Sequence, residues 1–184
     1  MRAYAYALAA LCAVPALATA QSMAGMQTDP ASPVSNALRA AEQRYAQNIT
    51  AALDAFPADK YGYKPTDSQM TVAQIAAHLV NEGNYLLCSR ASGQAEPDHA
   101  KVDTTSSKDA LMAALRASFD FCKSSFASLT DAQMGDSVPG FGPRKIARAS
   151  MVFITAGDWA DHYSQLANYL RLNNMVPPTA RRGM

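Results

Sequence analysis

The stretch from Ser150 to Pro178 constrains the fold of this chain more than any other. Its apolar residues recur with the helical period, and the closing prolines remove backbone donors and fix φ, which predicts one long amphipathic helix that stops there. Asp158 and His162 stand four residues apart in it, so they project from the same helix face on successive turns. The chain therefore presents a carboxylate and an imidazole side by side on one helix.

Three further stretches follow the same period, each bounded by residues that start or stop helices. Together with the first they predict helices over residues 35–56, 71–91, 106–129 and about 145–173. The expected N-caps of the first three are Ser35 or Asn36, Thr71 with Gln74 in a capping box, and Ser106 or Ser107. We find no alternating pattern long enough to predict a strand. Four helices of similar length, joined by loops long enough to place the start of the next helix, predict an all-α fold, a four-helix bundle.

A second pair, His78 and Glu82, repeats the four-residue spacing in the helix predicted over 71–91. At 100° per residue, both pairs fall at the margin of their helix's apolar arc, where a bundle leaves crevices between helices. One interpretation is a divalent-metal site with His78, Asp158 and His162 as ligands. Glu82 would then be a catalytic base, or a residue that does not bind the metal itself but orients the ligand His78. The other interpretation is a rim of surface contacts without metal.

Composition limits the class of function. The chain has 184 residues, a net charge of +1, 49% hydrophobic and 17% charged residues, which suits one globular domain with a real core. No Lys/Arg cluster marks one face, so nucleic acid is not an expected partner. No glycine-rich phosphate-binding pattern is found, so nucleotide cofactors are not expected either.

The N-terminus is typical of a secretory signal. Arg2 precedes a short, alanine-rich apolar run, and Ala18-Thr-Ala20 provides small residues for cleavage after Ala20. We expect residues 1–20 to be a signal peptide, 21–33 a flexible leader, 34–178 the bundle and 179–184 a tail. The protein is then periplasmic or secreted, with no membrane insertion after cleavage, because the run is too short for a span.

Export changes the meaning of the cysteines, because an oxidising compartment lets Cys88 and Cys122 pair. Cys122 falls in an apolar stripe, whereas Cys88 points away from the stripe of its own helix at 100° per residue. The sequence leaves both a disulfide and two free thiols open. The remaining histidine, His99, stands beside Asp98 in a polar loop and is expected to be solvated, and Tyr163 is expected in the core.

Four pieces of the chain carry a family resemblance: residues 58–65 (ADKYGYKP), 71–78 (TVAQIAAH), 84–89 (NYLLCS) and 161–178 (DHYSQLANYLRLNNMVPP). With them, the chain resembles the DinB-like family of metal-dependent, hydrolase-like four-helix bundles. The resemblance implies an up-down-down-up bundle, often a dimer. It also implies a metal such as zinc or nickel, held by one histidine on the second helix and an H-x-x-x-H pair on the fourth.

His78 matches the first ligand and His162 the last, but Asp158 stands where the resemblance implies a histidine. Aspartate ligates zinc, nickel or manganese and shifts the preference towards harder metals; alternatively the site has lost its metal. We therefore expect an exported, metal-binding, hydrolase-like protein that acts on a small molecule. The alternative is a non-enzymatic bundle that binds a small molecule or protein. Family members that use bacillithiol or mycothiol depend on cytoplasmic thiols, which an exported protein does not meet.

Overall fold

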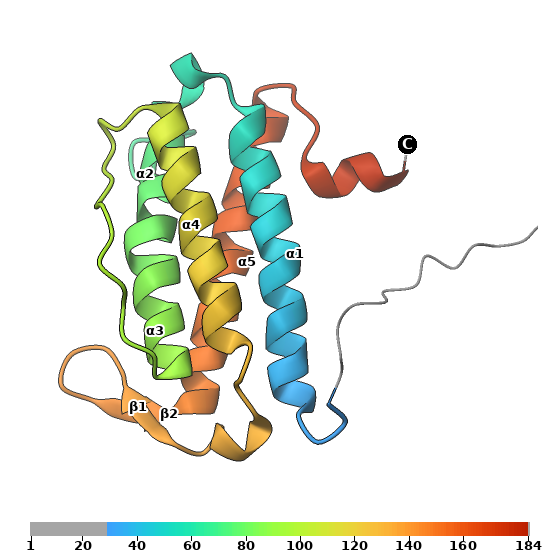
Figure 1. Ribbon diagram of the computed structural model, residues 1–184. Coiled ribbons are helices and arrows are strands. Elements are labelled where there is room, and N and C mark those ends of the chain that lie inside the picture. Colours follow the sequence, from blue (N-terminus) through green and yellow to red (C-terminus); the bar gives the residue numbers. More distant parts are fainter. Residues whose placement is uncertain (1–28, 184) are drawn as a thin grey trace, which may run out of the picture.

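The computed structural model describes residues 29–183, so the expected signal peptide 1–20 and leader residues 21–28 lie outside the described part. Long helices lie side by side as a bundle, and a short hairpin crosses one end (Figure 1). The helices and strands, in chain order, are α1 (Pro33–Ala55), α2 (Val72–His78), the π-helix η2 (Leu79–Leu86), α3 (Leu87–Ser92), α4 (Lys108–Phe126), β1 (Ser137–Pro139), β2 (Lys145–Ala147) and α5 (Arg148–Leu172). Because α2, η2 and α3 form one continuous rod, the fold is the four-helix bundle predicted from the sequence. Short 3-10 turns complete it at Ala58–Lys60 (η1), Asp131–Gln133 (η3) and Pro178–Gly183 (η4).

The first helix is capped from a distance. It begins at Pro33 after the N-cap Ser32, so the cap predicted at Ser35 or Asn36 is wrong by one turn. Proline suits the first helical position because its fixed φ is helical and that N–H has no partner in any case. The carboxylate of Asp131, from η3, accepts bonds from two backbone N–H groups of the first turn, each at 2.8 Å. It thereby supplies the cap that Ser32 does not make.

The second rod begins and ends as the sequence indicates. Thr71 and Gln74 form the predicted capping box, and Gly93 ends α3 at a left-handed φ of 82°. The π-helix Leu79–Leu86 in its middle was not predicted. A π turn holds more residues than an α turn, so the side chains that follow it are rotated relative to an unbroken α-helix.

This rotation explains why Cys88 is able to pair with Cys122. An unbroken α-helix would point Cys88 away from the core, but after η2 the side chain is fully buried. It forms a disulfide with Cys122 of α4, with a Cα–Cα distance of 5.2 Å. Of the two alternatives that the sequence left open, the structure has the disulfide.

The hairpin shortens the last helix. Strands β1 and β2 pair antiparallel, with Val138 opposite Ile146, so α5 begins at Arg148 rather than at the predicted 145. Strands of three residues are too short to show the alternation by which strands are recognised. The helix ends at Leu172, ahead of the prolines. No helix within residues 29–183 is long and apolar enough to cross a membrane.

Trp159 lies at the centre of the bundle. Its indole is completely buried against the rings of Tyr45 from α1 and of Phe119 and Phe126 from α4. Its Nε1 donates to Oδ1 of Asn84 in η2 at 2.7 Å, so the buried N–H is satisfied. This bond fixes α5 against the π-helix one residue after Asp158, and so positions the candidate site.

Candidate metal centre

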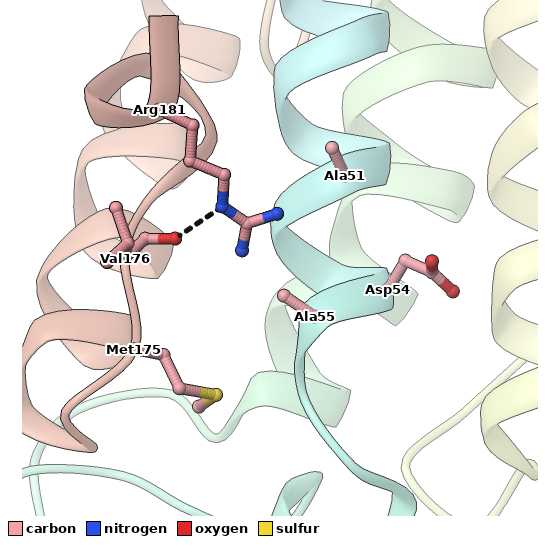
Figure 2. Close-up of a pocket in the computed structure, with 6 residues that line it drawn as sticks. All are labelled: Ala51, Asp54, Ala55, Met175, Val176 and Arg181. Carbon is pink, nitrogen blue, oxygen red and sulfur yellow. Dashed lines mark hydrogen bonds between the residues drawn. The ribbon is translucent and has the colours of Figure 1, made fainter. Parts of the chain in front are cut away.

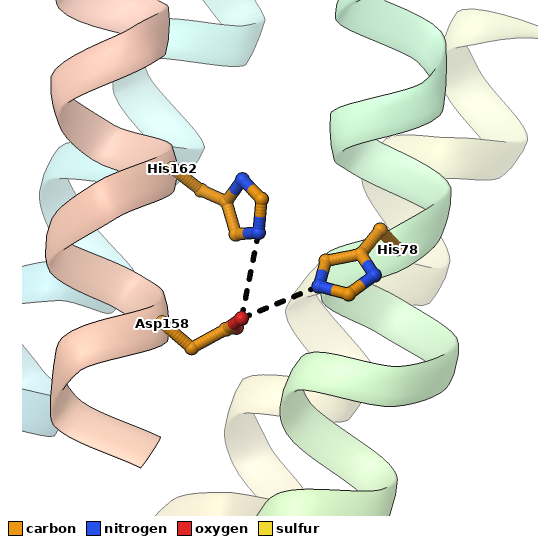
Figure 3. Close-up of side chains that lie close together, drawn as sticks. All are labelled: His78, Asp158 and His162. Carbon is orange, nitrogen blue, oxygen red and sulfur yellow. Dashed lines mark hydrogen bonds and ion pairs between the residues drawn. The ribbon is translucent and has the colours of Figure 1, made fainter. Parts of the chain in front are cut away.

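Two helices bring His78, Asp158 and His162 to one point. His78 is the last residue of α2, and the other two residues lie one turn apart on α5 (Figure 3). Oδ1 of Asp158 lies 3.3 Å from Nε2 of His78 and 3.4 Å from Nε2 of His162. The two imidazole rings stand at 60° with centroids 4.7 Å apart. One potential ligand atom from each of the three residues lies within 4.8 Å of the others.

The three side chains differ in exposure. His162 is 8% exposed, Asp158 18% and His78 28%, so the cluster is closed on the α5 side and opens towards His78. The helical period placed these residues at the margin of the apolar arc of each helix, and partial burial is what that position predicts. The cluster is thus partly exposed at His78, while its carboxylate is largely withdrawn from water.

Glu82 lies behind His78. Its Oε2 is 2.5 Å from Nδ1 of His78, the ring nitrogen that does not face Asp158, and its side chain is 63% exposed. Here Nδ1–H donates to the carboxylate, which leaves Nε2 directed at Asp158. Of the two roles considered for Glu82, this contact favours the orienting one.

The cluster strongly favours an ionised Asp158. Burial raises the pKa of its carboxyl, but the hydrogen bonds and charges of His162 and His78 outweigh burial and hold the pKa at about 2. The hydrogen bond to Asp158 raises the pKa of His78 despite the opposing effect of burial, and Glu82 raises it further. Without a cation, His78 is therefore drawn towards its imidazolium form.

The arrangement fits a metal ion. Four ligands at about 2.0–2.1 Å from a tetrahedral zinc stand about 3.3–3.4 Å from one another, and the two nitrogen–oxygen separations here have that size. Within the described residues, Asp158 Oδ2 and His162 Nδ1 are buried without a hydrogen-bond partner. Two imidazoles and a carboxylate are a donor set that zinc and other first-row divalent metals use.

Other sequence-predicted residues lie elsewhere. His99 was expected to be solvated, and this is wrong: its ring stacks on Tyr85 at 3.7 Å and its side chain is 8% exposed. Tyr163 is only half-buried, and its hydroxyl bonds to Thr179 at 2.8 Å instead of lying in the core.

An open groove of about 520 Å³ separates α1 from the C-terminal segment (Figure 2). None of the triad lines it; its lining residues are Ala51, Asp54, Ala55, Met175, Val176 and Arg181.

Two residues that shape the site were missed by sequence reasoning. Gly83 packs against Asp158, and Asn84 holds Trp159 beside it. The available signal was Gly83 itself, because a glycine inside a helical pattern costs stability and usually has a packing reason.

A bundle that places two imidazoles and a carboxylate at one point between two of its helices has the arrangement from which four-helix bundles build metal sites. The chain belongs to the DinB superfamily, whose family model matches residues 41–166. The resemblance predicted from the sequence motifs is therefore confirmed, and so is the fold.

Two solved structures show how far the likeness extends. A DinB-like protein from Bacillus subtilis is 15% identical, with a TM-score of 0.61 over 76% of this chain and 93% of that chain. A DinB-like protein from Bacillus cereus ATCC 10987 is 12% identical, with a TM-score of 0.62 over 77% and 93%. At these identities the likeness establishes the fold alone. No curated protein matches this chain.

Proposed function

We propose that this chain is an exported, divalent-metal-binding DinB-like protein with hydrolytic activity on a small molecule, and that His78, Asp158 and His162 are the ligands. One observation carries the proposal: a single carboxylate oxygen faces two imidazole Nε2 atoms at 3.3 and 3.4 Å. Two acceptor lone pairs directed at a carboxylate repel it unless a proton or a cation lies between them, and the separations suit a metal.

The residues divide the work as follows. A divalent metal, when bound, supplies a Lewis acid that polarises a substrate oxygen and lowers the pKa of water. Asp158 provides the negative charge that favours a cation, and the buried His162 fixes the closed side of the site. Glu82 orients His78 on the open side, where a small substrate would enter.

Export is part of the proposal. It is supported by the signal-like residues 1–20 and by the disulfide between Cys88 and Cys122, since such bonds persist mainly in oxidising compartments. It also argues against transfer reactions that depend on cytoplasmic thiols. The proposed partners are a small molecule and a second copy of the chain.

Metal content tests the proposal. Residues 21–184 are purified without chelator and without a nickel column, and elemental analysis is applied to wild type, His162→Ala and Asp158→Asn. We expect about one metal per chain in wild type and a large loss in both variants. His99→Gln, which changes the histidine outside the triad, serves as the control and should keep its metal. Equal metal in all four proteins, or a wild type that stays empty after reloading with zinc, nickel and manganese, would contradict the assignment.

A second function is a metal-free binding bundle. The observation that favours it is the ion pair itself: Asp158 is held ionised and the pKa of His78 is raised, so an imidazolium–carboxylate contact joins α2 to α5 without a cation. This alternative predicts that a chelator changes neither the melting temperature nor ligand binding. A drop in melting temperature on chelation would exclude it.

A further inference from the structure

Gly83 is in contact with the candidate metal ligand Asp158. A Cβ atom built on Gly83 would lie 2.7 Å from Oδ2 of Asp158, closer than real Cβ contacts come. Its other neighbours, a methyl group of Leu79 at 3.5 Å and the carbonyl of His78 at 3.7 Å, are at ordinary van der Waals distance. The only atom in conflict with a side chain at position 83 is therefore an oxygen of the carboxylate.

The two helices are tied together at this point. Asn84, the next residue of the π-helix, accepts from Trp159 Nε1 at 2.7 Å and donates to Ser118 Oγ of α4 at 2.8 Å. Trp159 is in turn the residue that follows Asp158. Because all of these groups are buried, separating η2 from α5 would leave polar atoms unpaired. A side chain at position 83 would instead turn the Asp158 side chain about its own bonds.

We propose that Gly83 is a positioning residue for Asp158, and that its bare Cα determines which metals the site prefers; the inference rests on the proposed function. Asp158 is the only oxygen donor in the triad. Carboxylate ligands suit harder ions such as Mn²⁺, whereas imidazoles suit Ni²⁺ and Zn²⁺. Moving the carboxylate while both imidazoles stay in place therefore weakens Mn²⁺ binding more than Ni²⁺ binding.

The chain supplies a matched control for a test. Gly157 lies immediately before Asp158 on α5, and a Cβ there meets nothing within 4 Å. Mn²⁺ and Ni²⁺ are titrated calorimetrically into wild type, Gly83→Ala and Gly157→Ala. Gly83→Ala should lose about 10–100-fold in Mn²⁺ affinity, the range for residues that hold a ligand in place, and clearly less in Ni²⁺ affinity. Gly157→Ala should match wild type.

The melting temperature distinguishes a specific effect on Asp158 from a general destabilisation of the protein. Alanine is a better helix former than glycine, and this gain offsets the cost of turning Asp158, so the metal-free Gly83→Ala protein should melt close to wild type. Equal affinities in Gly83→Ala and Gly157→Ala would overturn the inference. A proportional loss for both ions would overturn it too, because that indicates general loosening.

A double-mutant cycle on metal-free protein makes the test independent of metal uptake. Unfolding by urea is compared for Gly83→Ala in the wild-type and Asp158→Ala backgrounds, and we expect a larger gain in stability when the carboxylate is absent. Additive effects would overturn the steric link. Should wild type bind neither ion, the proposed function fails while the cycle still decides whether Gly83 positions Asp158.

Discussion

Two carboxyl groups that are largely withdrawn from water, Asp158 and Glu42, have pKa values shifted in opposite directions by their neighbours. Asp158 is held at a pKa of about 2 because the opposing effect of burial is overcome by two imidazoles. Glu42 lies on the core face of α1 with 5% exposure. Its burial raises the pKa to about 7, with a smaller opposing effect from Lys123 and a further rise from Asp120. The same chemical group is thus fixed as an anion at one site and kept protonated into the neutral range at the other.

Glu42 predicts a pH-dependent stability. The folded chain keeps the Glu42 proton between its ordinary pKa of 4.5 and about 7, while the unfolded chain has already lost it. The free energy of unfolding therefore falls as pH rises through this window. Glu42→Gln removes the penalty, so at pH 8 it should exceed wild type by about 1–3 kcal/mol and at pH 4 equal it. Urea unfolding at several pH values measures this, with Asp59→Asn at an exposed carboxylate as control. A constant difference at every pH would contradict the assignment to Glu42.

At the scale of elements, local signals were predictable and tertiary ones were not. The capping box of Thr71 and the stop at Gly93 are written in adjacent residues, and both were predicted correctly. The i,i+4 spacing and the family resemblance together singled out the three clustered residues. The π-helix was not predicted, and the contact that Asn84 makes from it, with Trp159, lies 75 residues further on. The cap that Asp131 makes on α1 likewise spans 96 residues and leaves no local pattern.

Removing the disulfide, which links the second rod to α4, should lower the free energy of unfolding substantially. Cys88 and Cys122 are 34 residues apart, and closing a loop of that size stabilises a fold by about 3–4 kcal/mol. The variant Cys88→Ala with Cys122→Ala should lose about that much in urea unfolding and still fold, because the Trp159–Asn84 bond is independent of it. Reduced wild type should agree with the variant. A variant as stable as oxidised wild type would show that the bond adds nothing.

The whole molecule relies on specific ties between its second rod and the rest of the bundle. Besides the disulfide and Asn84, the buried guanidinium of Arg148 donates to the carbonyl of Ala91 at the end of α3, at 2.8 Å. The imidazole–carboxylate cluster makes another tie in the first half of the rod, at His78. The proposed metal would lie at a contact between α2 and α5 that the fold already makes.

The disulfide also connects the fold to the place where the chain is proposed to act. A buried bond of this kind forms where thiols are oxidised, so processing and oxidation should go together. We expect residues 1–184, expressed in a Gram-negative host, to yield a periplasmic product that begins at Gln21 and has the intact mass of the oxidised form. A variant with Ala18→Glu and Ala20→Glu should remain uncleaved, because the cleavage site needs small residues. A full-length, reduced wild-type chain in the cytoplasm would contradict both export and the formation of the disulfide during it.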